Sequence, residues 1–334
     1  MKLYPNITVY FFIWFICLLA IFSFGLSGKD LISNLANWDG GHFLTIAKFG
    51  YQEKYLYAFF PLYPIAINLV SKITGDYLIA ALLISVISAF LTMQILYKLI
   101  LLDFGSKLAE KTIIFLLIFP TSFFLVTAYS ESLFLFLVVS SFYYFRKEKI
   151  VRAVIFAGLA SGTRLAGLAL SLALIFQIVS FGINKKNRII LFAPLGFIIY
   201  CIYLFNTTGD PFYFLAAESS NWQRTLSIPG VSFWQTLKNQ NYIELAFGIF
   251  GVGMILRSLR FLPAVYSVYG LLSILLPVAT SSLVSMPRFL LPIFPIFILL
   301  SMLKNPKAIF FIQLIFILFL SAFCILFING FWVS

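Results

Sequence analysis

The chain consists almost entirely of long apolar runs, and this feature constrains its fold more than any other. Of its 334 residues, 62% are hydrophobic and only 10% are charged, whereas soluble proteins have roughly half and a quarter, respectively. A soluble fold of this size cannot hide so much apolar surface from water. A bilayer removes that limit, since a helix of about 20 apolar residues crosses its hydrocarbon. We therefore expect a polytopic, all-α integral membrane protein with one domain over residues 1–334.

About eleven stretches of the sequence are candidate transmembrane helices. The first follows a lysine and could imitate a signal peptide, but it is too long and lacks a small-x-small cleavage motif, so we expect a retained helix. The eleven stretches are residues 7–27, 77–97, 112–128, 131–145, 153–167, 168–183, 189–206, 241–256, 261–281, 288–303 and 308–330.

The distribution of basic residues orients these spans, because inner loops of membrane proteins are enriched in Lys and Arg. With the N-terminus inside, fifteen basic residues lie on the inner side: Lys2, Lys98, Lys107, Lys111, Arg146, Lys147, Lys149, Arg152, Lys185, Lys186, Arg188, Arg257, Arg260, Lys304 and Lys307. Eight lie on the outer side: Lys29, Lys48, Lys54, Lys72, Arg164, Arg224, Lys238 and Arg288. Counting residues 58–73 as a further span would invert every later loop and spoil this asymmetry.

Two long outer loops, residues 28–76 and 207–240, are predicted to carry function. Long loops in compact proteins are usually functional or disordered, and these contain aromatic residues and glycines in specific arrangements. Residues 58–73 contain two prolines three apart, so we expect a re-entrant or interfacial segment there. Residues 40–49 have apolar residues on one side, which predicts a short helix lying at the membrane interface.

The net charge of +12 does not indicate a nucleic-acid partner. The basic residues form short clusters between apolar runs, and no single basic face emerges. The three cysteines, all within apolar runs, provide neither a disulfide framework nor a metal-ligand spacing. There is no Asp-x-Asp motif, and we assign no metal ligands and no cofactor.

Five ionisable residues near the predicted spans fall on the outer side of the membrane. They are Asp39, Glu131, Arg164, Asp210 and Arg288. An ionisable group at or near the hydrocarbon is costly and is by default a functional candidate. The basic-residue count that set the topology did not use the acidic residues, so this convergence is an independent indication of a site.

Each of these residues also has a simple structural explanation. Asp39 can cap the helix that begins at Gly40, and Glu131 can cap its own helix or pair with an arginine. The two arginines can reach the interface with their charged ends or pair with acids. Asp210 precedes Pro211, a common way to open a turn.

The residues around Asp39 exceed what a helix cap requires. Trp38 is typical of an interfacial anchor, and Asp39 is followed by two glycines and then His42. His42 is the only histidine of the chain. We expect His42 to pack or to form hydrogen bonds rather than to act in catalysis.

One reaction accounts for an acid and arginines on the outer side of a membrane protein. A sugar carried on a lipid phosphate needs an apolar groove for the lipid and cations for the phosphate, to which arginine is well suited. Transfer of the sugar to a hydroxyl needs one carboxylate that accepts the proton. The phosphate is already a good leaving group, so a second acid is not required.

At these residues the sequence resembles the PIG-V family of membrane glycosyltransferases, the GPI mannosyltransferase 2 family, which has the GT-C fold. The motifs occur in order over most of the chain, and the first is the most specific. They are Trp38-Asp39-Gly40-Gly41-His42-Phe43, Ile46-Ala47, Gly50-Tyr51, Ala58-Phe59-Phe60-Pro61-Leu62-Tyr63-Pro64, Tyr129-Ser130-Glu131-Ser132-Leu133-Phe134, Thr163-Arg164, Gly209-Asp210-Pro211-Phe212, Trp222, Arg224, Arg288 and Pro292.

The resemblance implies a GT-C-like bundle that transfers mannose, or a related hexose, from a polyprenyl-phosphate donor with inversion at the anomeric carbon. It implies that Asp39 is the catalytic base. The other candidates are then expected to bind the donor phosphate or the substrate: Trp38, His42, Glu131, Arg164, Asp210 and Arg288.

The expected partners are the donor, membrane lipids and a glycan or lipid acceptor, with protein hydroxyls as a further acceptor class. The resemblance places the enzyme in the cell membrane with its active site on the extracytoplasmic face, or in the ER membrane of a eukaryote. Two alternatives stay open. A lipid or solute transporter or flippase would favour internal repeats and a site at the membrane midplane, whereas a non-catalytic assembly subunit would tolerate substitution of Asp39.

Overall fold

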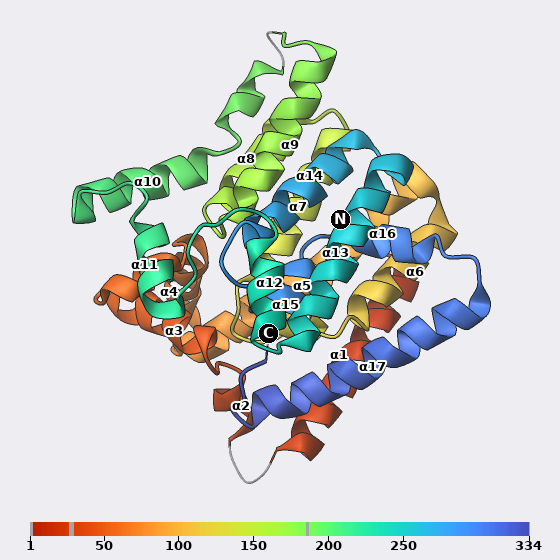
Figure 1. The fold of residues 1–334 in the computed structure, drawn as a ribbon, viewed down its shortest axis with the longest axis horizontal. Coiled ribbons are helices and arrows are strands. Elements are labelled where there is room, and N and C mark those ends of the chain that lie inside the picture. Colours follow the sequence, from red (N-terminus) through yellow and green to blue (C-terminus); the bar gives the residue numbers. More distant parts are fainter. Residues whose placement is uncertain (1–2, 27–29, 185–186, 334) are drawn as a thin grey trace.

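The computed structural model describes residues 3–26, 30–184 and 187–333, and within these ranges all regular elements are helices, apart from one isolated bridge between Leu226 and Thr280 (Figure 1). This confirms the all-α class. Four residues of the charge count, Lys2, Lys29, Lys185 and Lys186, lie outside the described residues.

Five helical segments of the described chain are long and apolar enough to cross a bilayer. They are α1 (Pro5–Gly25), α5 (Tyr77–Phe104), the combined segment of η3 (Arg188–Phe192) and α10 (Leu195–Thr208), α13 (Tyr242–Phe261) and α17 (Pro306–Ile328). Shorter helices pack among them: α6 (Ser106–Leu117), η2 (Ser122–Leu125), α7 (Glu131–Arg146), α8 (Ile150–Ser161), α9 (Ala166–Phe181), α14 (Ala264–Val278), α15 (Met286–Leu290) and α16 (Pro295–Ser301). The total of about eleven spans stays a prediction.

Several predicted spans are not continuous helices, and prolines explain two of these differences. The span expected over residues 112–128 ends at Leu117, and the buried segment before α7 is irregular except for η2. Pro120 lacks an amide hydrogen and disfavours helical backbone at the residue before it. The span expected over residues 288–303 is likewise split into α15 and α16, with Pro292 in the break and Pro295 at the start of α16.

The two long loops contain helices of their own. The first holds α2 (Leu31–Asn34), α3 (Asp39–Phe49), η1 (Lys54–Ala58) and α4 (Leu62–Thr74), and the second holds α11 (Tyr213–Trp222) and α12 (Val231–Lys238). The helix expected over residues 40–49 is therefore present as α3. α4 is regular despite its prolines, because Pro61 caps it and Pro64 lies in its first turn, where the amide is not needed. With 13 residues, α4 is about 20 Å long and cannot span the hydrocarbon alone.

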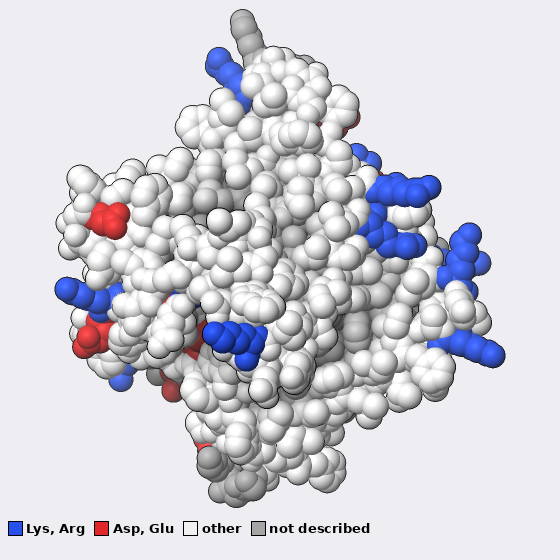
Figure 2. All heavy atoms as spheres, viewed as in Figure 1, with Lys and Arg blue, Asp and Glu red and all other residues white. Residues whose placement is uncertain are grey.

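The arginines assigned to the inner side and those assigned to the outer side form their ion pairs at separate places in the fold. Arg146, assigned to the inner side, pairs with Asp103 at 2.5 Å, and Asp103 also accepts a hydrogen bond from Tyr266 at 2.5 Å. Arg164 and Arg288, assigned to the outer side, pair with other acids, described below. Most of the surface seen in Figure 2 is neither basic nor acidic, and many basic groups gather near the connection of α16 and α17.

Helices α8 and α10 touch through glycines, and this contact sets the position of the turn that carries Arg164. A Cβ atom on Gly196 would lie 2.2 Å from the carbonyl oxygen of Gly158 and 2.6 Å from the amide nitrogen of Gly162. Small residues allow helix backbones in membranes to approach this closely. The carbonyl of Gly162 also accepts a hydrogen bond from the Leu62 amide at 3.0 Å, which ties the start of α4 to the end of α8.

Candidate active site

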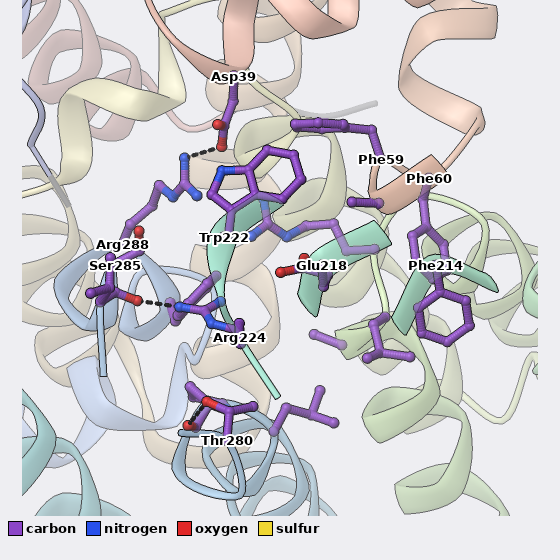
Figure 3. Close-up of a pocket in the computed structure, with 18 of the residues that line it drawn as sticks. Asp39, Phe59, Phe60, Phe214, Glu218, Trp222, Arg224, Thr280, Ser285 and Arg288 are labelled. Carbon is purple, nitrogen blue, oxygen red and sulfur yellow. Dashed lines mark hydrogen bonds and ion pairs between the residues drawn. The ribbon is translucent and has the colours of Figure 1, made fainter. Parts of the chain in front are cut away.

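A cavity of about 560 Å³ lies where the two long loops meet the α8–α9 turn and the segment between α14 and α16 (Figure 3). Its size falls within the range of roughly 300–1,000 Å³ usual for small-molecule sites. Aromatic side chains form much of the lining: Phe43, Phe59, Phe60, Phe214, Trp222, Tyr269, Phe289 and Trp332. Charged side chains from distant parts of the sequence complete it: Asp39, Arg164, Glu218, Arg224 and Arg288.

Asp39 is the first residue of α3, and its carboxylate lines the cavity. Its Oδ2 atom accepts a hydrogen bond from Nη1 of Arg288 at 2.5 Å, and its side chain is only 13% exposed. A carboxylate in the first turn of a helix is favourable, because the helix dipole is positive there. The cap position itself belongs to Trp38, whose side chain makes no capping hydrogen bond. Asp39 therefore serves an ion pair across the fold.

Glu131 joins the arginines on which the sequence analysis focused. Its Oε1 atom accepts a hydrogen bond from Nη1 of Arg164 at 2.6 Å and lies 3.6 Å from Nε of Arg288. The Glu131 side chain is 1% exposed. Two acids and two arginines thus alternate in one buried chain, Asp39–Arg288–Glu131–Arg164, and their formal charges cancel.

Arg288 is held by both its ion pairs and its backbone. Ser285, just before α15, has a φ of 67°, in the left-handed region that side chains other than glycine adopt rarely. The Arg288 guanidinium then lies between 5.5 and 5.7 Å from the ring centres of Phe124, Tyr129 and Phe289. Cation–π contacts of this kind favour a desolvated arginine.

Two further charged residues that line the cavity were not among the predicted site residues. Glu218 belongs to α11, and Arg224 follows the end of this helix. Burial raises the pKa of Glu218 while the nearby positive charge of Arg224 lowers it, and burial lowers the pKa of Arg224. Phe214, Glu218 and Trp222 are spaced by four and so share one face of α11. That spacing is a signal from which Glu218 could have been found.

Arg224 is the arginine of the cavity without an acid as direct partner among the described residues. Its guanidinium donates a hydrogen bond to the Val284 carbonyl and lies 4.8 Å from the ring centre of Phe289. Gln223 before it has a φ of 52°, which turns the chain at the end of α11. The next residues then pair with the α14–α15 connection: the Thr225 carbonyl accepts from the Ser281 amide at 2.8 Å.

Strained backbone is concentrated at this cavity. Five residues other than glycine have a positive φ in the described chain. Three of them lie at the cavity. Trp38 directly precedes Asp39, and Gln223 directly precedes Arg224. Ser285 precedes the helix of Arg288 and also lines the cavity. Such conformations cost on the order of 1–3 kcal/mol each and are concentrated at functional sites.

Four predicted site residues lie outside the cavity lining: Glu131, described above, and Trp38, His42 and Asp210. The Trp38 ring packs on Trp332 at 5.1 Å, and its Nε1 donates to the Phe331 carbonyl at 3.3 Å. His42 packs against aromatic rings, and burial lowers its pKa although Asp39 opposes the shift. Asp210 is exposed and accepts the Phe212 amide at 2.8 Å, which is the turn-opening arrangement.

The cavity offers no obvious metal centre. Nowhere in the described ranges do three or more His, Cys, Asp or Glu side chains gather as metal ligands do. Asp39, which lines the cavity, and Glu131, which is buried outside the lining, both have arginines as their direct charged partners.

Comparisons with known proteins agree with the sequence resemblance. The sequence model of the family described as Mannosyltransferase (PIG-V) matches residues 17–184. The GPI alpha-1,6-mannosyltransferase 2 of Homo sapiens is 32% identical over 151 residues, which is 42% of this chain and 31% of that protein. The corresponding protein of Mus musculus is 32% identical over 153 residues, with the same shares covered. The chain thus matches about a third of the length of these relatives.

A solved structure has a similar fold. ArnT from Cupriavidus metallidurans bound to undecaprenyl phosphate superposes with a TM-score of 0.57 and 16% identity, over 92% of this chain and 62% of that chain. Its apo form gives a TM-score of 0.51. The likeness concerns the fold and confirms the GT-C-like bundle expected from the sequence.

Proposed function

This chain belongs to the mannosyltransferase (PIG-V) family, and from that premise we propose that it transfers mannose, or a related hexose, from a polyprenyl-phosphate donor to an acceptor hydroxyl. The acceptor is a lipid-linked glycan or another hydroxyl compound. One observation carries the proposal: the Asp39 carboxylate and three arginines line a single cavity whose remaining wall is largely aromatic. Such a cavity suits a phosphate and a sugar at its polar end and an isoprenoid chain along its apolar wall.

The reaction requires one bond to form and one to break at the same carbon. The acceptor oxygen attacks the anomeric carbon, and the bond between this carbon and the phosphate oxygen breaks, so the configuration inverts. The acceptor proton passes to the Asp39 carboxylate, which acts as general base. The bonding electrons leave with the polyprenyl phosphate, whose negative charge the arginines stabilise.

The ion pair with Arg288 has a consequence for Asp39. One oxygen of the Asp39 carboxylate accepts a hydrogen bond at 2.5 Å from the Arg288 guanidinium and is occupied by this contact. A donor phosphate competes for the same guanidinium, because arginine binds phosphate and carboxylate through the same fork of donors. We expect the bound donor to draw Arg288 partly away from Asp39, so that the base is released only when the donor is in place.

The other predicted site residues are proposed to contribute to different extents, some through direct contact with the substrate and others indirectly. Arg164 and Arg288 contribute positive charge to the phosphate end, and Glu131 positions both of them. Trp38 and His42 act indirectly, by holding the first outer loop in place. A substrate contact by Asp210 needs a movement of its turn towards the cavity.

The nature of the donor rests on two comparisons. The family is that of mannosyltransferases, and the protein of similar fold is described as bound to undecaprenyl phosphate. Both support a sugar carried on a polyprenyl phosphate.

The test uses the purified protein in detergent with a synthetic polyprenyl-phosphate mannose and a panel of glycolipid acceptors. We expect Asp39→Asn to lower the transfer rate on the order of 10²- to 10⁴-fold. Glu53→Gln, an exposed acid of the same loop outside the cavity lining, is the matched control and is expected to leave the rate unchanged. Transfer by Asp39→Asn at the wild-type rate would refute the role of Asp39. Movement of lipid without sugar transfer would favour the transporter alternative.

We propose that the active site faces the extracytoplasmic side of the cell membrane, or the lumen of the ER. Lys54 is the first residue of η1, whose last residue, Ala58, lines the cavity, and Lys98 lies near the C-terminal end of α5. Single cysteines at these positions, in a background without the native cysteines, are labelled in intact cells with a membrane-impermeant maleimide. Only the cysteine at position 54 is expected to react, and equal reaction of both would refute this topology.

A further inference from the structure

The cavity contains a carboxylate for which the proposed reaction has no use. Glu218 of α11 lines the cavity, and Figure 3 shows its carboxylate pointing into it. Within the described ranges this carboxylate makes no hydrogen bond, and no Lys or Arg nitrogen lies within 4.0 Å of it. Asp39 and Glu131, by contrast, are held by arginines. Among the described residues, Glu218 is therefore an acceptor that faces the cavity without a direct protein partner.

An aromatic side chain, that of Trp222, lies one helical turn after Glu218 and stands beside its carboxylate in the cavity. Trp222 lies four residues after Glu218, so both project from one face of α11. The Trp222 ring packs edge-on against Phe59 with 5.6 Å between ring centres, and its indole also lines the cavity. Its rotation is restricted by this packing, and a rigid aromatic surface thus stands beside an unsatisfied acceptor.

An aromatic surface beside a carboxylate matches the chemistry of a sugar. A hexose presents C–H groups on a face of its ring, which pack on an aromatic ring, and hydroxyl groups at its edge, which donate hydrogen bonds to a carboxylate. The phosphate end of a donor is served by the arginines, and the isoprenoid chain needs no polar partner. Only the sugar requires both features together.

We propose that Glu218 and Trp222 form the subsite that holds the hexose of the donor. Glu218 accepts hydrogen bonds from hydroxyl groups of this hexose, and the Trp222 indole packs on its ring. This inference rests on the proposed function, because it assumes a sugar-phosphate lipid as the ligand. Glu218 is a specificity-determining residue in this arrangement, and the proton of the acceptor goes to Asp39.

The first experiment measures binding without turnover. The purified protein is titrated with polyprenyl-phosphate mannose and with the unsubstituted polyprenyl phosphate of equal chain length. Wild type is expected to bind the mannosylated lipid more tightly, and Glu218→Gln is expected to lose on the order of 10- to 100-fold of this preference. Glu53→Gln, the exposed control, is expected to keep it. A preference that survives in Glu218→Gln overturns the subsite.

The second experiment identifies the hydrogen bond with donors that each lack one hydroxyl group. One of these donors lacks the hydroxyl group that hydrogen-bonds to Glu218. This donor is expected to bind wild type and Glu218→Gln with equal affinity, because it cannot form that hydrogen bond with either protein. If, for every hydroxyl group, the loss of affinity from the substitution and the loss from the missing hydroxyl multiply independently, the proposal is overturned. A drop in kcat with unchanged donor binding, or a rise confined to the KM of the acceptor, also overturns it, since Glu218 would then serve another step.

Folding and function are separated by further measurements. Glu218→Asp keeps the charge, and Trp222→Phe keeps an aromatic ring; each is expected to retain part of the preference at an unchanged unfolding temperature. If wild type prefers the mannosylated lipid but transfers no sugar to any acceptor, the proposed function fails and the subsite stands. If transfer occurs and Glu218→Gln keeps the preference, the subsite alone fails.

Discussion

Replacing Glu131 by glutamine removes the acid that Arg164 and Arg288 share, and we expect a large loss of stability. Coulomb's law with an effective dielectric constant of about 20 gives an attraction of roughly 6 kcal/mol for the 2.6 Å contact with Arg164 and roughly 5 kcal/mol for the 3.6 Å contact with Arg288. Desolvation of the buried ions opposes much of this attraction.

The net loss follows from what remains after the substitution. Arg164 is 17% exposed and Arg288 is 9% exposed, so neither charge returns to water once Glu131 is neutral. Breaking a buried ion pair from one side costs about 3–5 kcal/mol. For a chain of 334 residues that corresponds to a decrease of roughly 4–7 °C in the unfolding temperature.

The assay is thermal unfolding of the purified variants in detergent, followed by tryptophan fluorescence at one fixed scan rate. Removing the opposite charge as well, in Glu131→Gln with Arg164→Met, is expected to restore about 1–3 kcal/mol relative to the sum of the single losses. Glu53→Gln is the exposed control. If the two single losses add without coupling, or if Glu131→Gln unfolds at the wild-type temperature, the buried network is not a source of stability.

Two further predictions concern pH and packing. Burial lowers the pKa of His42, and the negative charge of Asp39 opposes this shift. The unfolded chain therefore binds the proton more readily than the folded protein. The contribution of His42 to stability is complete above about pH 6.5 and decreases as the pH falls below this value. Unfolding temperatures from pH 8 to 5 are expected to fall less in His42→Gln than in wild type, and parallel curves would contradict this. Gly196→Ala places a methyl group 2.2 Å from the Gly158 carbonyl and is expected to destabilise the protein by about 1–3 kcal/mol. Gly253→Ala, with no atom within 4 Å, is the helical control, and equal unfolding temperatures for the two alanine variants would refute the close contact of α8 and α10.

The positions of helices could be predicted where hydrophobicity and breakers agree. α1, α7 and α17 begin and end within about two residues of their predicted limits. The predictions were wrong where an apolar run contains prolines, since hydrophobicity continues through a break in the helix. Pro120 and Pro292 mark such places, and both were visible in the sequence.

The candidate site was predicted in part. Asp39, Arg164 and Arg288 could be singled out because ionisable residues beside apolar runs are rare, and the structure brings these three residues to one cavity. Glu218 was missed because it lies in a more polar loop, where an acid is unremarkable by itself. Its relation to Trp222 becomes meaningful only when α11 is known to be a helix facing a cavity.

The sequence alone determined the membrane class, the helical secondary structure and the presence of Asp39 in a long loop, because these depend on composition and on neighbours along the chain. Tertiary structure decided which charges meet. Asp39 and Arg288 are separated by 249 positions and are joined at 2.5 Å, and Glu131 is shared between arginines from two other segments. No local pattern encodes such pairs, since they depend on how the helices pack. Packing also left Glu218 without a hydrogen-bond or ion-pair partner among the described residues, and this is what singles it out as a binding group.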